Sequence, residues 1–231
     1  MNLSNTPSER IAEILGLLAQ TYGTHPWHSH RDPMSELIFT ILSQHTSDNN
    51  SGRAFEQLRA AFPTWEDLAA ANLEAIARAI WVGGLARMKA PRIKAILNKI
   101  QGELGSFDLS FLEALPVAEA KAWLRTLPGV GPKTAACVLL FSLGRPALPV
   151  DTHVYRVARR LGLLDPRSTT DQAHKLLEEL LPAEAFYHFH MSLVQHGRRV
   201  CKPQLPLCHQ CILAHLCPSA FSSGALERSE R

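Results

Sequence analysis

The sequence contains no uninterrupted run of about 18 apolar residues, the length that a helix needs to cross a membrane. Residues 1–20 also lack the basic start and the apolar centre of a secretory signal. We therefore expect a cytoplasmic protein with no membrane partner. No segment alternates apolar and polar residues with β-branched enrichment, so we predict that the fold has no sheet.

Neither sign of charge dominates the composition. The chain has 24 lysines and arginines against 21 aspartates and glutamates, which gives a formal net charge of +3. This mild excess is compatible with a nucleic-acid partner but does not establish one. Hydrophobic residues make up 46% of the 231 positions, enough to bury the core of one large domain or of two small ones.

Apolar residues recur at helical spacing along most of the chain. Thr64, followed by Asp67 three residues later, resembles a capping box and marks one further helix start. The pattern predicts an all-α protein. The expected helices lie at 11–18, 37–42, from 64 onward, and at 73–81, 89–104, 117–127, 132–143, 151–161, 171–181 and 183–199.

A glycine turn between two apolar helices occupies residues 127–135, with the sequence Leu-Pro-Gly-Val-Gly-Pro-Lys-Thr-Ala. Glycine adopts backbone angles denied to other residues and lets a phosphate approach closely. The amides that follow would face an anion at the positive end of the helix dipole. The string predicts a helix–hairpin–helix that grips a DNA backbone without reading its sequence, and a simple interhelical turn is the alternative. The expected contacts are Gly129, Val130, Gly131 and Thr134.

Lys133 would occupy the first turn of the second hairpin helix, where the dipole disfavours a cation. Partial burial there would favour the neutral amine, which can attack the anomeric carbon of a bound sugar. A charged lysine that only contacts phosphate explains the position equally well. Asp151 starts the string Asp-Thr-His-Val and is either a helix N-cap or a carboxylate that activates the nucleophile and stabilises positive charge on the sugar.

Four of the five cysteines cluster near the C-terminus, with the spacing C-x6-C-x2-C-x5-C. In a reducing compartment such a cluster indicates metal ligands rather than disulfides. Four thiolates suit either a tetrahedral zinc ion or a [4Fe–4S] cluster, and the spacing alone does not choose between them. The fifth, Cys137, lies in an apolar helix and is expected in the core. The expected ligands are Cys201, Cys208, Cys211 and Cys217.

Together, the hairpin string, the Val-Asp-Thr-His-Val string at 150–154 and the cysteine spacing resemble the endonuclease III family. That family is the bifunctional DNA glycosylase/AP lyase branch of the helix–hairpin–helix glycosylases. The resemblance runs from about residue 32 to residue 217. It implies that Lys133 is a Schiff-base nucleophile, that Asp151 is the essential carboxylate, and that the four cysteines hold a [4Fe–4S] cluster.

The resemblance also implies two helical domains with a DNA cleft between them. A six-helix barrel with the helix–hairpin–helix would cover 34–145, and a helical iron–sulfur domain would combine 1–33 with 146–218. Residues 219–231 are small and polar, and we expect a disordered tail. The expected protein is a nucleoid-associated, prokaryote-like monomer whose partner is double-stranded DNA with a damaged base or an abasic site.

A glycosylase must take its target base out of the stack and fill the gap. In the family, a glutamine in a Leu-Ser-x-Gln-like turn fills it. Alignment through Thr46 puts His45 at that position, with Gln44 one residue earlier, which departs from the family pattern. Leu85, on a glycine loop, resembles the family's wedge leucine. A polar helix end and a buried loop anchor are the respective alternatives.

The expected reaction removes a damaged, oxidised pyrimidine through a lysine Schiff base and nicks the strand by β-elimination. Arg198 and Lys202 would contact DNA phosphates beside the cysteine cluster. Adenine-DNA glycosylases carry a catalytic glutamate near Thr40 and lack the lysine, so that branch is excluded. The alternatives are a mismatch-type thymine or uracil glycosylase and a non-catalytic, redox-sensitive DNA-binding protein.

Overall fold

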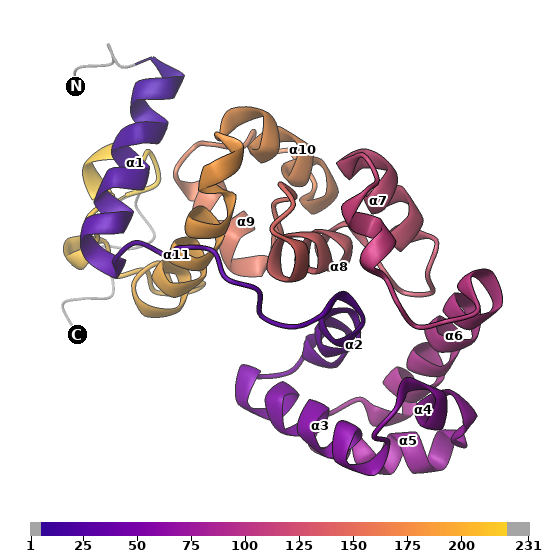
Figure 1. Ribbon diagram of the computed structural model, residues 1–231. Coiled ribbons are helices and arrows are strands. Elements are labelled where there is room, and N and C mark those ends of the chain that lie inside the picture. The colour runs from indigo at the N-terminus through magenta and orange to yellow at the C-terminus, as the bar shows by residue number, and fades with distance from the viewer. Residues whose placement is uncertain (1–5, 221–231) are drawn as a thin grey trace. The chain divides into compact units, whose positions relative to one another are not determined.

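The computed structural model describes residues 6–220, which form helices, turns and loops without a β-strand. The chain divides into two compact units, shown in Figure 1. The middle unit is His28–Arg145, and the terminal unit combines Met1–Trp27 with Pro146–Arg231. The predicted all-α fold is confirmed. Within 6–220, no helix is long and apolar enough to cross a membrane.

In the middle unit, α2 is the central helix and packs against α3, α6, α8 and η3. Its residues Leu37, Ile38 and Ile41 are fully buried, and each such side chain contributes about 1.5–3 kcal/mol to stability. The elements of this unit are α2 (Pro33–Ser43), α3 (Asp48–Ala61), α4 (Trp65–Ala70), α5 (Leu73–Ala79), η1 (Trp81–Gly83), α6 (Ala86–Leu104), η2 (Ser110–Glu113), α7 (Val117–Arg125), α8 (Pro132–Cys137) and the π-helix η3 (Val138–Ser142).

Helix α3 has no counterpart among the helices predicted from the sequence. Its polar composition hides the apolar period, because its buried side includes only Ser51, Ala54 and Leu58. The Ser47 side chain caps its start by accepting a hydrogen bond from the Asn50 amide at 3.4 Å. Tertiary packing against α2 and η1 therefore determines this helix more than its own pattern does.

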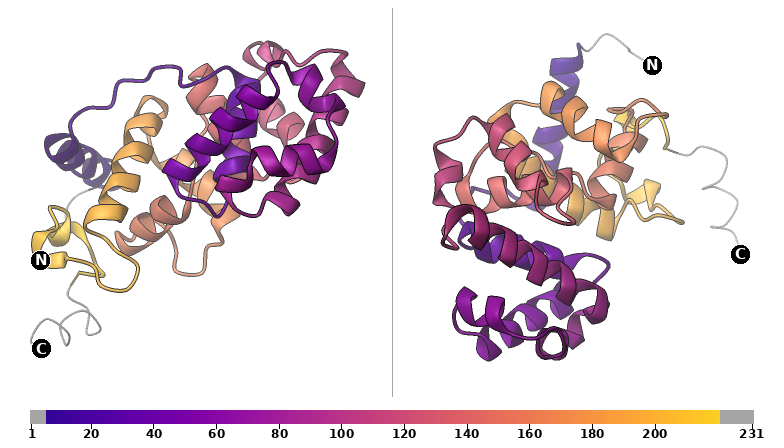
Figure 2. Two further views of the ribbon diagram at one scale, coloured as in Figure 1. Left: turned by 90° about the horizontal axis from the view of Figure 1, so that it is seen from below. Right: turned by 90° about the vertical axis from the view of Figure 1, so that its right-hand side faces the viewer.

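In the terminal unit, α11 packs against both α1 and α9. The cysteine-bearing segment, yellow in Figures 1 and 2, lies beside the end of α11, where the Leu207 amide donates to the Val200 carbonyl at 3.0 Å. The elements of this unit are α1 (Pro7–Tyr22), α9 (Thr152–Arg160), α10 (Thr170–Leu180), η4 (Ala183–Ala185), α11 (Phe186–Arg199), η5 (Cys208–Gln210) and η6 (Ala214–Leu216).

Several local predictions are confirmed, and others need correction. The capping box of Thr64 and Asp67 is present in both directions. The helix expected at 132–143 is instead α8 followed by the π-helix η3, and the helix expected at 183–199 begins with the short 3-10 turn η4. The compact units divide at 27/28 and 145/146, whereas the predicted domains divide at 33/34 and 145/146. The predicted domain boundaries stay predictions. Of the expected disordered tail, Ser219 and Ala220 form a turn, and the remainder lies outside the described residues.

Candidate functional site

The glycine turn connects α7 to α8, as Figure 1 shows, so the helix–hairpin–helix predicted from the sequence is present. Leu127 and Val130 are buried and anchor the turn, and the Val130 amide donates to the Leu127 carbonyl at 3.1 Å. Gly129 has a φ of 73°, which favours glycine. Gly131 has a φ of −95°, which any residue can adopt, so of the two glycines only Gly129 uses the backbone freedom of glycine.

The amides of this turn divide into two groups. The Val130 amide is used inside the turn, and the Val130 and Thr134 side chains are buried, so neither side chain is available to a ligand. The amides of Gly131 and Thr134 make no backbone hydrogen bond within residues 6–220. These two amides, unlike the amide of Val130, lack a backbone partner at the start of α8, where an anion would be stabilised by the helix dipole.

Arg92 of α6 connects two predicted DNA-contacting segments, and the sequence patterns did not identify it. Its guanidinium donates to the Gln44 side-chain oxygen at 2.6 Å. A Cβ atom added at Gly129 would lie 2.3 Å from the Arg92 Nε atom. Gly129 therefore serves two purposes: it adopts a left-handed backbone, and it lets the Arg92 side chain cross the turn.

The two hairpin glycines should respond differently to alanine. Gly129→Ala is expected to cost about 1–2 kcal/mol from the left-handed backbone alone, and to lower the Tm by roughly 2–8 °C. Gly131→Ala is the matched control, because no atom lies within 4 Å of its added Cβ and its backbone is unstrained. Thermal unfolding followed by circular dichroism measures both, and equal Tm values for the two variants would contradict this account.

Lys133 occupies the second position of α8 and is half-buried. It lies close enough to Glu36 of α2 for its positive charge to lower the pKa of that carboxyl group. Burial has the larger opposing effect and raises the Glu36 pKa, while the Arg31 guanidinium lowers it. The predicted nucleophile therefore stands near a buried acidic group that sequence reasoning missed.

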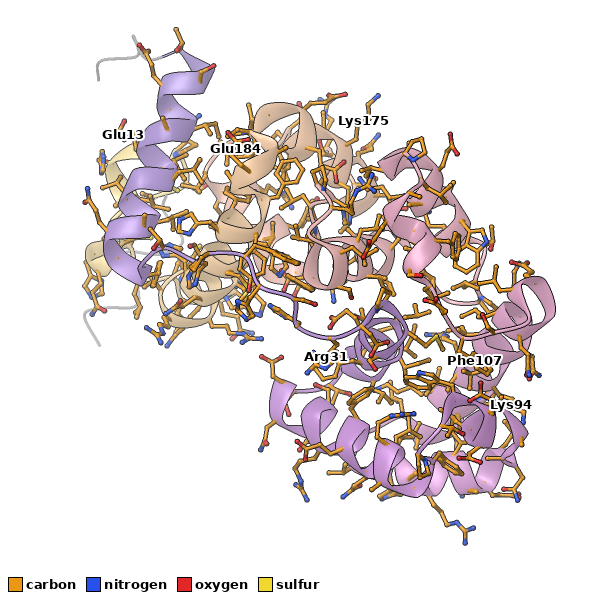
Figure 3. The ribbon with its side chains drawn as sticks, in the orientation of Figure 1. Glu13, Arg31, Lys94, Phe107, Lys175 and Glu184 are labelled. Atoms are coloured by element: carbon orange, nitrogen blue, oxygen red, sulfur yellow. The ribbon has the colours of Figure 1, made fainter. Side chains whose placement is uncertain are left out.

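Two hydrogen bonds hold Glu36 in place. One carboxylate oxygen accepts from Arg31, labelled in Figure 3, at 3.1 Å, and the other accepts from the Thr40 hydroxyl at 3.3 Å. Glu36 and Thr40 are both buried and stand one helical turn apart. A polar pair at i and i+4 on an otherwise apolar helix is a signal that could have identified the site from sequence.

His45 and Leu85 are the only residues other than glycine with positive φ in the described part of the chain, at 53° and 50°. Both are exposed, Leu85 to 48%. Such backbone strain persists only where the surroundings enforce it, and it is common at functional sites. The alternative of Leu85 as a buried anchor is excluded. Gln44 ends α2 and is half-buried against Arg92.

Asp151 is the N-cap of α9, and its side chain accepts a hydrogen bond from the Val154 amide at 2.7 Å. The capping role proposed from the sequence is therefore present, and it orients the carboxylate. Asp151 belongs to the terminal unit, whereas Lys133 belongs to the middle unit.

The four clustered cysteines form no disulfide and are all half-buried. The pKa of the Cys211 thiol is raised to about 11, chiefly by burial and in part by the other three thiols, so all three lie within electrostatic range of Cys211. Burial also raises the pKa of the Cys217 thiol. A bound cationic centre would offset this effect of burial, because it stabilises thiolates. Within 6–220, no three or more His, Cys, Asp or Glu side chains stand close enough to form a preformed metal site, so the choice between zinc and an iron–sulfur cluster stays a prediction.

Two arginines of α9 fix the start of the cysteine segment. Arg156 donates to the Cys201 carbonyl at 3.0 Å. Arg160 donates to the Cys201 sulfur at 3.3 Å and to the Lys202 carbonyl at 2.7 Å. The helix that Asp151 caps is thus bonded to the segment that carries the exposed side chain of Lys202. Arg198, at the end of α11, is also exposed.

Known proteins resemble this chain over most of its length. The model of the HhH-GPD superfamily base excision DNA repair proteins matches residues 38–183. Endonuclease III of Thermotoga maritima is 39% identical over 190 residues, which cover 82% of this chain and 84% of that protein. An Arabidopsis thaliana protein named as a DNA glycosylase is 41% identical over 162 residues, and the match spans 70% of this chain and 55% of that protein.

Solved structures show the same fold. The non-covalent endonuclease III–DNA complex matches with a TM-score of 0.79 and 31% identity, over 94% of this chain and 97% of that chain. A thermostable thymine-DNA glycosylase matches with a TM-score of 0.76 at 24% identity, which shows a shared fold only. The chain belongs to the HhH-GPD superfamily of base excision DNA repair proteins, within which it is an endonuclease III-like DNA glycosylase.

Proposed function

We propose that this protein is a bifunctional DNA glycosylase/AP lyase that acts as a monomer and removes oxidised pyrimidines from double-stranded DNA. The observation that carries the proposal is the position of Lys133. It stands in the first turn of α8, directly after the glycine turn, where the Gly131 and Thr134 amides have no backbone partner. A phosphate bound there would bring the adjoining deoxyribose towards an amine.

The proposed reaction begins when the neutral Lys133 amine attacks C1′ of the deoxyribose. The bond between C1′ and the base breaks, and the base leaves with its electron pair and takes up a proton. Asp151 stabilises the positive charge that develops on the sugar and accepts the proton that the attacking nitrogen loses. The sugar ring then opens to a Schiff base on Lys133.

The second half of the reaction is an elimination. A proton leaves C2′ of the Schiff base, and the bond between C3′ and its oxygen breaks, so that the phosphate departs and the strand is nicked 3′ to the lesion. Water then hydrolyses the Schiff base and releases the Lys133 amine. No oxidant or reductant is consumed.

Access to the lesion requires that the base leave the stack. We assign Gln44 and His45 to the gap left by the flipped base and Leu85 to a wedge against the opposite strand. The exposure of His45 and Leu85 and their strained backbones support this assignment.

A [4Fe–4S] cluster bound by Cys201, Cys208, Cys211 and Cys217 would hold the segment that carries Lys202 in a fixed conformation. We assign the cluster a structural role. Lys202 and Arg198 would then contact DNA phosphates.

The wild-type protein should excise thymine glycol from a duplex and be trapped by borohydride on a duplex with one abasic site. Both reactions follow from an amine that attacks C1′. Excision and trapping are measured on denaturing gels, with a G·T mismatch and a G·U mismatch as competing substrates. Faster excision from a mismatch than of thymine glycol would favour a mismatch-type thymine or uracil glycosylase. Excision without trapping would exclude the lyase, and binding without any excision would leave only a DNA-binding protein.

A further inference from the structure

Lys89 of α6 is a buried cation that the proposed reaction does not use. Its side chain is only 3% exposed. Its Nζ atom donates three hydrogen bonds, to the Leu42 carbonyl at 2.6 Å, to the Thr46 hydroxyl at 2.8 Å and to the Gly83 carbonyl at 2.9 Å. These acceptors come from two segments that are far apart in the sequence.

The hydrogen-bond count identifies the protonation state that this geometry needs. Three acceptors require three N–H groups, which an ammonium has and a neutral amine lacks. Burial opposes that charge and lowers the pKa of Lys89 to about 8. A buried lysine is costly unless its hydrogen bonds are complete, so the three acceptors are what keep this side chain in place.

The two segments that meet at Lys89 are the ones that carry the strained, exposed residues. Leu42 and Thr46 flank His45 and lie at the end of α2, whereas Gly83 precedes Gly84 and Leu85. The Thr46 hydroxyl also bonds directly to the Gly83 carbonyl. The positive φ angles of His45 and Leu85 thus occur in two loops with a shared hydrogen-bonding centre.

We propose that Lys89 is a positioning residue that holds the His45 loop and the Leu85 loop together, so that both enter the DNA duplex as one rigid unit. The inference rests on the proposed function of these loops in base flipping. If the two loops are already ordered before DNA binds, no binding free energy is lost in ordering them when the base is extruded.

Lys89→Met tests the inference, because methionine fills a similar volume and removes all three donors. The matched control is Lys94→Met, at another lysine of α6, labelled in Figure 3. The Lys94 Nζ atom donates to the Ala69 carbonyl and, at 2.8 Å, to the Ala71 carbonyl, away from both loops. The two variants therefore remove the same charge and the same kind of bond from one helix.

Lys89→Met is expected to slow single-turnover excision of thymine glycol from a duplex by about 10- to 100-fold, the cost of a loosened site. Cleavage of a single-stranded oligonucleotide with an abasic site should stay at the wild-type level, because that substrate has no base to flip and no opposite strand to wedge. Lys94→Met should leave both rates unchanged. The inference would be overturned if both variants lost the same fraction of the excision rate, or if Lys89→Met slowed the reactions on both substrates equally. An excision rate in Lys89→Met equal to that of the wild type would overturn it as well.

A second readout follows flipping itself. A 2-aminopurine opposite the lesion should brighten when wild-type protein unstacks it and should stay dim with Lys89→Met. This measurement separates the two proposals, because it tests the loops even if the wild-type protein proves inactive. If Lys89→Met does not fold, Thr46→Val replaces it. That variant removes one acceptor of Lys89 and the hydrogen bond from Thr46 to Gly83. It should slow excision from the duplex and leave cleavage of the single-stranded substrate unchanged. A wild-type rate of excision from the duplex would overturn the inference.

Discussion

Lys133→Gln is expected to abolish the borohydride-trapped complex with abasic DNA and to lower strand cleavage by more than about 10³-fold. The glutamine side chain cannot form a Schiff base, and it keeps a polar group at the second position of α8. DNA binding should persist, since the Gly131 and Thr134 amides are unchanged. Trapping is measured on a denaturing gel, and binding is measured by fluorescence anisotropy at one fixed salt concentration.

Asp151→Asn is the companion variant for this experiment. Asparagine caps helices as well as aspartate does, so α9 should remain intact while the carboxylate charge disappears. We expect excision to fall by on the order of 10²–10⁴-fold with an unchanged Tm.

A trapped complex that survives in Lys133→Gln would assign the nucleophile to another amine, and the proposed mechanism would then be wrong.

Cys211→Ser is expected to abolish binding of the proposed [4Fe–4S] cluster and to destabilise the terminal unit. The purified variant should lack iron and the absorbance near about 400 nm that iron–sulfur proteins show. The lost binding energy should amount to about 4 kcal/mol, as for a ligand far above its Kd, and this should lower the Tm by roughly 8–16 °C. Iron analysis, absorbance spectroscopy and thermal unfolding measure these effects.

Cys137→Ala is the matched control for the cluster variant. Cys137 lies in α8 with 2% exposure, in the middle unit, and we predict no ligand role for it. The control should keep its iron and lose only about 1 kcal/mol of stability. A wild-type protein that is colourless and contains zinc would contradict the iron–sulfur assignment. Loss of iron in Cys137→Ala would contradict the assigned ligand set.

Features that depend only on neighbouring residues can be predicted from the sequence. Most helix periods and the Thr64 capping box are short-range patterns that predict the structure correctly, and the N-cap at Asp151 is one of the two roles that its position offers. The hairpin string was also sufficient, because its glycines, its proline and the flanking apolar helices act within one short stretch of chain. Helix α3 escaped prediction because its few apolar residues leave almost no period.

The burial of polar groups and their contacts depend on how the helices pack and are not visible in the sequence. Glu36 approaches Lys133 because α2 packs on α8, and Lys89 and Arg92 reach their partners because α6 lies beside α2. Most of these partners are far apart in the sequence, since Lys89 lies 47 residues from Leu42 and Arg92 lies 48 residues from Gln44, so no local pattern reveals them. The same holds for the strained backbones of His45 and Leu85, since surrounding contacts rather than residue type hold a side-chain-bearing residue at positive φ.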